Sequence, residues 1–170
     1  MQGNALYYCV KYRHEPDIVR LLLDFGADVT ETGERGETCL MAAARYNLLQ
    51  TCRLLVERGC GVYETDDHGR YAIHACAISI YNTSSTIEYL LTEVGKTADV
   101  NLRDFHERTP LHAAVAVQNI AVTETLLGYG ADVHAKSDAG KTPVQLAIRG
   151  TELWQMLIDH GATDDHMVVL

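Results

Sequence analysis

The sequence predicts an all-α solenoid of about five stacked helix-turn-helix units. Two short phrases support this prediction, because each returns at a nearly constant distance and the two stay in phase. The first phrase stands at Thr38–Met41, Tyr71–His74, Thr109–His112 and Thr142–Gln145, whose first residues lie 33, 38 and 33 positions apart. The second stands at Gly26–Val29, Gly59–Val62, Thr97–Val100, Gly130–Val133 and Gly161–Asp164. A period of this size is typical of stacked structural units rather than of one mixed core.

The two phrases together divide the chain into units. We expect a single domain, 1–170, with units at about 1–33, 34–66, 67–104, 105–137 and 138–170. The chain is long enough to bury a sizeable core. Its apolar content of 47% and charged content of 22% are typical of a soluble globular protein.

The first phrase predicts a short helix. Thr109 suits the N-cap, because its hydroxyl can accept a backbone N–H that has no partner inside the helix. Pro110 fits the first turn, where no N–H is needed. Leu111 and the small pair Ala113–Ala114 provide a face that can pack closely, and the polar Gln118–Asn119 ends the helix.

A longer helix should follow in each unit. In the second unit it runs from Leu48 to Arg58, where Cys52 and Leu55 continue an apolar series at helical spacing. Gly59 suits the left-handed position just after the helix ends. The segment leading to the next unit is polar and rich in turn-forming residues, as in Lys136–Gly140.

At their 33-residue spacing, the phrases TPLHAA at Thr109–Ala114 and GADV at Gly130–Val133 resemble those of ankyrin repeats. The resemblance covers essentially the whole chain. It implies two antiparallel helices per repeat, a projecting turn and an L-shaped stack. It also implies that each unit leans mainly on its neighbours.

The resemblance further implies roles for individual residues. His74 and His112 occupy the histidine of TPLH and should bridge the backbones of neighbouring repeats. Met41 and Gln145 replace this histidine in the second and fifth units, so those junctions should lose or alter the hydrogen bond. Asn101 occupies a position that is sometimes hydroxylated in the family, although hydrogen bonding within the turn is its expected main role.

Several segments depart from the repeat pattern. The third unit has five extra residues, which alignment places near Ile80–Tyr81 and Val94–Lys96. The fifth unit is short between its helices, around Arg149–Thr151, and Asp164–Met167 would form a polar closing cap. The first unit begins almost inside its first helix, at Asn4–Tyr7. We therefore expect a piece of a longer protein, and a degenerate true N-terminus is the alternative.

Composition narrows the class of partner and the compartment. The net charge of −9, with 14 basic and 23 acidic residues, argues against nucleic acid. No apolar run approaches the length of a membrane span, and no secretory leader opens the chain. The five cysteines stand mostly among apolar residues of predicted helices, which favours buried thiols in the cytoplasm or nucleus. We also expect a monomer.

No arrangement of residues predicts an enzyme, a metal site or a cofactor site. His74 and Cys76 lack the spacing of zinc ligands and would point in different directions on a helix. Gly140–Thr142 lacks the earlier glycine of a phosphate-binding loop. The paired acids Asp66–Asp67 and Asp164–Asp165 are interpreted as solvated turn and cap residues. We therefore expect no catalytic, metal-binding or cofactor-binding residues.

The function predicted is recognition of another protein, as a peptide or a domain face. A solenoid presents an extended concave surface, and the family resemblance implies that turn tips and first helices form it. The expected contact residues are Glu34, Arg35, Glu37, Arg45 and Tyr46 in the second unit, Asp67, His68, Arg70, Ile78 and Tyr81 in the third, Phe105, His106, Arg108, Ala116 and Val117 in the fourth, and Asp138, Lys141 and Arg149 in the fifth.

Three arginines and one aromatic residue are prominent among these expected contact residues. Arg35, Arg70 and Arg108 are predicted to form a ladder at matching turn positions, where they would bind an acidic, aromatic-containing peptide beside Phe105. The alternative is that they are ordinary solvated side chains, with Phe105 folded back on its neighbour. The cluster of Ile78, Ile80 and Tyr81 is expected to pack on the stack, with partner contact as the alternative.

Two other functions remain open at this point. The stack could serve as a structural scaffold or spacer that packs against other domains of the same chain. It could also belong to an enzyme, although the sequence offers no site for one.

Overall fold

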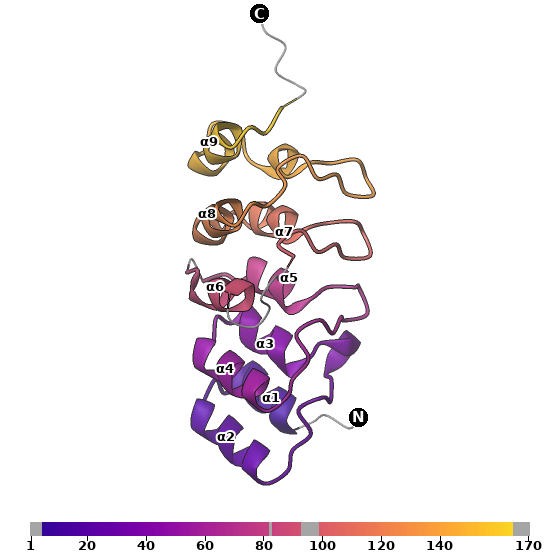
Figure 1. The fold of residues 1–170 in the computed structure, drawn as a ribbon, viewed down its shortest axis with the longest axis vertical. Helices are drawn as coiled ribbons and strands as arrows, with labels where there is room; N and C mark the ends of the chain where they lie inside the picture. Colours follow the sequence, from indigo (N-terminus) through magenta and orange to yellow (C-terminus); the bar gives the residue numbers. More distant parts are fainter. Residues whose placement is uncertain (1–4, 82, 93–98, 165–170) are drawn as a thin grey trace, which may run out of the picture.

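The computed structural model describes residues 5–81, 83–92 and 99–164, and all the elements within these ranges are helical. Helices lie in pairs that stack in one direction, from α1 and α2 at one end to α9 at the other (Figure 1). The α-helices are α1 Ala5–Tyr12, α2 Pro16–Asp24, α3 Cys39–Arg45, α4 Leu49–Glu57, α5 Ala72–Ala77, α6 Ser85–Thr92, α7 Pro110–Ala116, α8 Ile120–Gly128 and α9 Glu152–Asp159, and the 3₁₀ helices are η1 Glu34–Gly36 and η2 Pro143–Leu146. The predicted all-α solenoid is confirmed.

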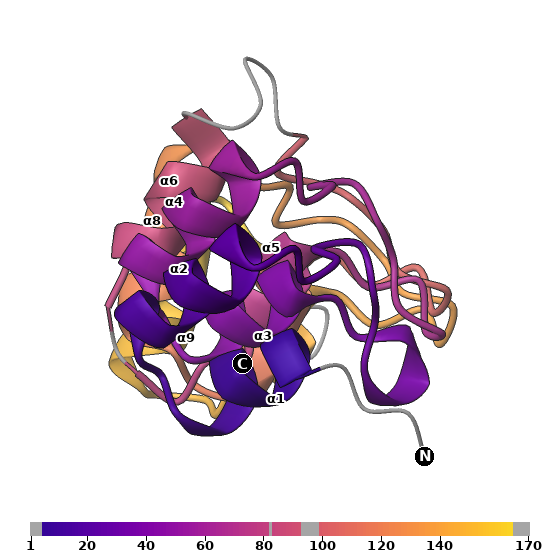
Figure 2. The ribbon, with the colours of Figure 1, turned by 90° about the horizontal axis from the view of Figure 1, so that it is seen from below.

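The stack has two helical layers and one row of turns. Helices α1, α3, α5 and α7 and the short η2 contact one another in sequence and form the inner layer. Helices α2, α4, α6, α8 and α9 form the outer layer in the same way. Viewed along the stack, the turns between units project together beyond the inner layer (Figure 2). This arrangement leaves a concave face between the turns and the inner helices.

The helix ends follow the local chemistry of the sequence. The Thr38 hydroxyl accepts the backbone N–H of Met41 at 3.1 Å, so it caps α3 as a threonine at this position should. Pro110 occupies the first turn of α7. After α4, Gly59 has φ of +90°, the left-handed conformation that ends a helix without the steric penalty of a side chain.

Small and apolar side chains let the inner helices approach one another closely. Ala42, Ala43 and Ala44 of α3 are fully buried, with α1 on one side and α5 on the other. Larger residues such as Leu55 and Leu126 fill the space between the layers. The buried cysteines are Cys9, Cys39, Cys52, Cys60 and Cys76, and all are free thiols. Cysteine therefore serves here as a small apolar side chain.

Two histidines connect neighbouring units, as the family resemblance implied. His74 Nε2 lies 3.0 Å from the carbonyl oxygen of Arg108, and His112 Nε2 lies 3.0 Å from that of Lys141. In His112, Nδ1 accepts the backbone N–H of Thr109 at 3.2 Å. A nitrogen that accepts an N–H carries no proton, so this ring is neutral and donates from Nε2. Burial lowers the pKa of both histidines, which agrees with neutral rings.

The projecting turns share one hydrogen-bonding pattern. In each turn the N–H of a turn-start residue bonds to the carbonyl of a turn-end residue four positions later. The pairs are Gly33–Glu37 at 2.8 Å, Asp66–Arg70 at 3.1 Å, Asp104–Arg108 at 3.0 Å and Ser137–Lys141 at 3.0 Å. Adjacent turns are also joined, because the N–H groups of Asp67, Phe105 and Asp138 bond to the carbonyls of Arg35, His68 and His106. The row of turns is therefore held by backbone bonds along its length.

The fifth unit departs further from the repeat than the sequence suggested. Its first helix is only the 3₁₀ turn η2, and Ala147 then takes an extended conformation with ψ of 148°. The chain thus leaves Leu146 exposed beside the inner layer. Ile80 and Tyr81 are also exposed, which contradicts the expectation that the cluster of Ile78, Ile80 and Tyr81 packs on the stack. The expectations for Asn4, Val94–Lys96 and Asp165–Met167 lie outside the described residues.

Candidate binding groove

Each of the two middle turns is held by a buried aspartate. One oxygen of Asp104 accepts the backbone N–H groups of His106 and Arg108 at 2.8 and 2.9 Å. Its other oxygen binds the Arg108 guanidinium at 2.9 and 2.8 Å. Asp66 binds Arg70 in the same way, at 2.7 and 2.6 Å. Burial by itself raises the pKa of both carboxyls, but the hydrogen bonds from arginine and backbone outweigh it, so the pKa lies below its ordinary value.

These contacts correct the interpretation of the paired acids. Asp66 and Asp164 are buried rather than solvated, and Asp164 accepts a hydrogen bond from Arg149 at 2.9 Å. Asp67 is exposed, as expected. Asp165 lies outside the described residues. The error arose because adjacent acids in a turn resemble one another in sequence, whereas Asp66 and not Asp67 accepts the backbone N–H groups and binds the arginine.

The predicted arginine ladder is wrong for Arg35, and Arg70 and Arg108 have a different role from the one predicted. Arg35 is not a turn-end residue, because Glu37 takes that position in its turn. Arg70 and Arg108 do hold matching turn-end positions, but each guanidinium is bound by the aspartate of its own turn. Their charges are largely offset within the fold. Arg70 and Arg108 therefore stabilise their own turns, and Arg35 does not continue their series.

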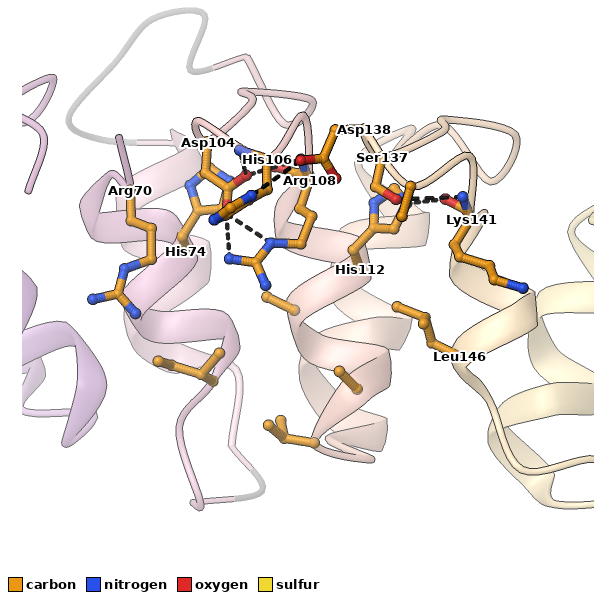
Figure 3. Close-up of a pocket in the computed structure, with 15 residues that line it drawn as sticks. Arg70, His74, Asp104, His106, Arg108, His112, Ser137, Asp138, Lys141 and Leu146 are labelled. Atoms are coloured by element: carbon orange, nitrogen blue, oxygen red, sulfur yellow. Dashed lines mark hydrogen bonds and ion pairs between the residues drawn. The ribbon is translucent and has the colours of Figure 1, made fainter. Parts of the chain in front are cut away.

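A groove with an apolar floor lies over α5, α7 and η2, with a volume of about 470 Å³. The floor is formed by Ile78, Ala113, Ala116, Val117 and Leu146. The turns form the opposite wall, with Arg70, Asp104, His106, Arg108, Ser137, Asp138, Ala139 and Lys141. Figure 3 shows these side chains, which come from three successive units. We call this region the apolar half of the groove.

Eight of the expected contact residues line this half together: Arg70, Ile78, His106, Arg108, Ala116, Val117, Asp138 and Lys141. Val117 is 45% exposed, so an apolar side chain of the floor faces solvent. His106 Nδ1 lies 3.0 Å from Asp138 at the tips of two adjacent turns. The Lys141 side chain extends away from these two residues, in the direction of the helices (Figure 3).

The groove continues toward the N-terminal end, but its character changes. This second region, the charged half, has a volume of about 380 Å³ and is lined by Lys11, Glu34, Arg35, Glu37, Arg45, Tyr46 and Arg70. Arg70 lines both halves, so they adjoin one another. No aliphatic side chain is among the residues that line the charged half, within the part of the chain that the structure describes.

Glu37 organises the charged half from a buried position. It is only 8% exposed, and its carboxylate accepts a hydrogen bond from the Tyr7 hydroxyl at 2.6 Å. The Arg45 guanidinium binds the other carboxylate oxygen at 2.7 Å. Burial and the bond to Glu37 raise the pKa of Tyr7 to about 12, and the hydrogen bond to Tyr7 raises the pKa of Lys11. These groups are therefore used mainly within the fold.

The other expected residues are more scattered. Phe105 is 72% exposed, yet its ring lies so close to Gly69 that a Cβ at that position would clash with it. Its ring therefore does fold back on the neighbouring turn, while its outer face stays open. Tyr81 is exposed, and Arg149 is paired with Asp164. Tyr46 contacts the ring of His14, with 4.5 Å between the centroids, and His68 is half-buried.

Sequence reasoning missed several residues that shape the groove. Lys11 and Tyr7 belong to the first unit, where the repeat phrase is too degenerate to assign them to the concave face. Leu146 was missed because a full helix was expected in the fifth unit, which would have given it another environment. The Asp104 and Ser137 turn-start residues had a detectable signal, because both stand four residues before a basic turn-end residue.

The cysteine thiols are buried. Burial raises the pKa of Cys39 and Cys76 to about 12, and burial also raises it for the other three cysteines, so the thiols stay protonated. No group of three or more metal-binding side chains gathers within the described ranges. Among the same residues, no helix has the length and apolar character that crossing a bilayer needs.

Comparison with known proteins agrees with this architecture. A family model described as ankyrin repeats, in three copies, matches residues 2–66 and 40–137. An ankyrin repeat protein of fowlpox virus (strain NVSL) is 30% identical over 171 residues, covering 94% of this chain and 48% of the viral protein. Neurogenic locus notch homolog protein 1 of Homo sapiens is 29% identical over 157 residues, covering 89% of this chain and 6% of that protein. The chain thus spans half or less of the length of these relatives.

Proposed function

The chain belongs to the ankyrin-repeat family, and from this premise we propose that it binds another protein through the concave groove. Ankyrin repeats are generally protein–protein interaction modules. One observation carries the assignment to this face: eight residues expected from sequence to contact a partner line the same apolar half of the groove. We also propose that the chain acts by binding alone, without a catalytic step.

The frame of the groove favours binding of this kind. Backbone hydrogen bonds join each turn to the next, and His74 and His112 join the inner helices to the turns. A surface that is ordered before the partner arrives loses little conformational entropy on binding. The partner meets an apolar floor with a polar rim, which is the usual composition of a protein interface.

The experiment places a photo-crosslinking amino acid at Val117, on the groove floor, or at Glu124, which is exposed on α8. We expect a specific crosslinked partner from position 117 and much less from position 124. Introducing Ala116→Trp should fill the floor and remove the crosslink. Equal yields at both positions, or a crosslink that survives Ala116→Trp, would contradict the assignment of this face.

A second role is that of a structural scaffold that packs against other domains of a longer chain. An exposed leucine on α2, in the first helix pair, favours this role. Leu21 in α2 is 55% exposed, whereas Leu54, at the matching position of α4, is 3% exposed. Hydrogen exchange would compare this chain alone with any longer natural form. Protection of α2 only in the longer form would support the scaffold role, and unchanged exchange there would argue against it.

We further propose that the protein is an intracellular monomer, in the cytoplasm or nucleus. Five buried, unpaired cysteines fit a reducing compartment. The net charge of −9 favours separate molecules, because copies repel one another. Sedimentation at low and physiological salt, and imaging of the tagged native protein, would test these two points.

A further inference from the structure

We propose that the apolar half of the groove recognises an extended, acidic segment of its partner, in which an apolar side chain lies close to a carboxylate. The apolar side chain would rest on the floor beside Val117 and Leu146, and the carboxylate would pair with Lys141. This inference rests on the proposed function, because it assumes that the groove is the binding face, and it adds the chemistry of the segment bound there.

The turn-start residues determine which basic groups of the groove wall are paired. Asp66 and Asp104 each bind the arginine at the end of their own turn. The last turn has Ser137 at this position, and among the described residues its hydroxyl accepts one hydrogen bond, from the backbone N–H of Lys141 at 3.3 Å. A neutral hydroxyl cannot offset the ammonium charge. The substitution of serine for aspartate thus leaves a cation at the groove wall without the partner that the two preceding turns supply.

No other described group takes the place of that aspartate. The ion pairs of the described residues include none that involves Lys141. Asp138 is occupied by His106 at the turn tips, and Lys141 extends away from both (Figure 3). Asp104 is satisfied by Arg108 and two backbone N–H groups. A carboxylate from outside the chain is therefore the complementary group for Lys141.

The floor supplies the second element of recognition. Ala113 and Ala116 are short side chains between Ile78 and Leu146, so the floor is hollow over α7. Lys141 and Leu146 line the same groove, one on the wall and the other on the floor. An apolar side chain buried on the floor would therefore bring a neighbouring carboxylate within reach of the ammonium group.

The occupant that we propose is an extended chain. Inner helices about 10 Å apart would make the path over three units about 20 Å long. Alternate side chains of an extended chain point to one face, so two or three of them could reach the floor along this path. The groove that receives them has a volume of about 470 Å³.

The probe for the test is a displayed library of random twelve-residue peptides, selected on the purified chain and counter-selected on Ala116→Trp. We expect the enriched peptides to contain an aliphatic or aromatic residue within three positions of Asp or Glu. Synthetic versions would then be titrated by fluorescence anisotropy. Peptides without an acidic preference, or no enrichment over Ala116→Trp, would overturn the inference.

A matched pair of variants isolates the role of Lys141 without changing that residue. Ser137→Asp restores the aspartate of the other turns, so the lysine should become paired and acidic peptides should bind about fivefold more weakly. Ser137→Asn has nearly the same shape as that aspartate without its charge, so any weakening caused by the larger side chain alone appears in both variants. Equal affinities of the two variants would contradict the inference, provided that thermal melting shows both to be folded.

Charge reversal separates this inference from the proposed function. Lys141→Glu should select peptides with Lys or Arg near the apolar residue, whereas Lys136→Glu, outside the groove, should select the original acidic ones. If bound peptides are lost in Ala116→Trp but ignore Lys141→Glu, the groove binds and the acidic preference is wrong. If they bind Ala116→Trp equally well, the proposed binding face itself is wrong.

Discussion

The two halves of the concave groove are built on the same turns, yet they use their charged residues differently. In the charged half, Glu37 is buried beneath Tyr7 and Arg45 and serves the fold. In the apolar half, Val117 is exposed over a floor of short side chains, and Lys141 has no ion-pair partner among the described residues. A high density of charged residues therefore does not by itself identify the part of the groove that is available to a partner.

The difference begins at the turn-start position. Gly33 stands there in the second unit, and a Cβ on it would clash with the Tyr7 ring. An aspartate is therefore excluded by the ring, and Glu37 pairs with Tyr7 and Arg45 instead. The last turn has Ser137, which also supplies no carboxylate, but no carboxylate among the described residues replaces it. In the charged half, the Glu37 contacts thus take the place of the missing aspartate. In the apolar half, no described carboxylate does so.

The largest effect on stability should come from Glu37→Ala. The substitution leaves Tyr7 and Arg45 without their carboxylate in a largely buried site, so the free energy of unfolding should fall by about 2–3 kcal/mol. Glu34→Ala is the control, because Glu34 is exposed and its nearest cation is 3.8 Å away. Urea unfolding of both variants gives the comparison. Similar losses for the two would contradict the structural role of Glu37.

A somewhat smaller effect is expected from Asp104→Asn, which keeps the shape but removes the charge that binds Arg108. The free energy of unfolding at pH 7 should fall by about 1–2 kcal/mol. The folded pKa of Asp104 is lower than the unfolded value of 3.8, so its contribution is present above that pH and is lost as the pH falls through the folded pKa.

Thermal melting between pH 7 and pH 2.5 tests this second prediction. The gap between the original chain and Asp104→Asn should narrow at the acid end. Asp138→Asn is the matched control, since Asp138 is exposed and its carboxylate contacts the half-exposed imidazole of His106 in the preceding turn. A gap that stays constant with pH would show that the charge of Asp104 is not what stabilises the turn.

His112→Gln should have a smaller effect, with a distinct dependence on pH. Gln145 shows that glutamine can accept the threonine N–H at this position, at 3.1 Å. The loss is then mainly the bond from Nε2 to the Lys141 carbonyl, about 1 kcal/mol. Urea unfolding at pH 7 measures it, and a loss near zero would contradict the bridging role.

The stability difference between the original chain and the same variant should also change with pH in a defined direction. The folded pKa of His112 lies below the unfolded value of 6.5, so the unfolded chain binds more protons between the two values. Stability should therefore be complete above pH 6.5 and decline as the pH falls below it. His112→Gln should remove part of that decline between pH 7 and pH 5. An unchanged slope would mean that this histidine does not titrate with unfolding.

The smallest effect on stability should come from Leu146→Ser in the apolar half. Leu146 is exposed at the end of η2, so the free energy of unfolding should change by less than about 0.5 kcal/mol. Peptide binding should nevertheless weaken, because the floor loses an apolar side chain. The measurement is urea unfolding combined with anisotropy titration. A large loss of stability would place Leu146 in the fold rather than in the binding surface.

Periodicity was sufficient to predict the fold, because the repeated phrases encode contacts between adjacent units. The bridging roles of His74 and His112 and the left-handed position of Gly59 followed from the same phrases. The partners of individual charged side chains could not be predicted from these phrases. Counting residues in the turn placed Arg35 in the ladder, whereas the hydrogen bonds place Glu37 at the turn end.

The remaining misses have two physical causes. Whether a charged residue is solvated depends on which neighbour fills the space beside it, and that neighbour can come from another unit. Tyr7 lies thirty residues before the Glu37 that it binds, so their contact is not visible in one repeat considered alone. Leu146 is exposed because η2 ends after one turn, and this local departure from the repeat is not encoded in the repeated phrases.

The most direct test of the central claim is amide chemical-shift mapping by NMR, with a peptide that Ala116→Trp fails to bind. The account predicts large shifts in α7 and in the turns at 104–108 and 137–141, and small shifts at 34–37 and in α3. Shifts concentrated in the charged half, or on the outer layer, would contradict the claim that the apolar half receives the partner.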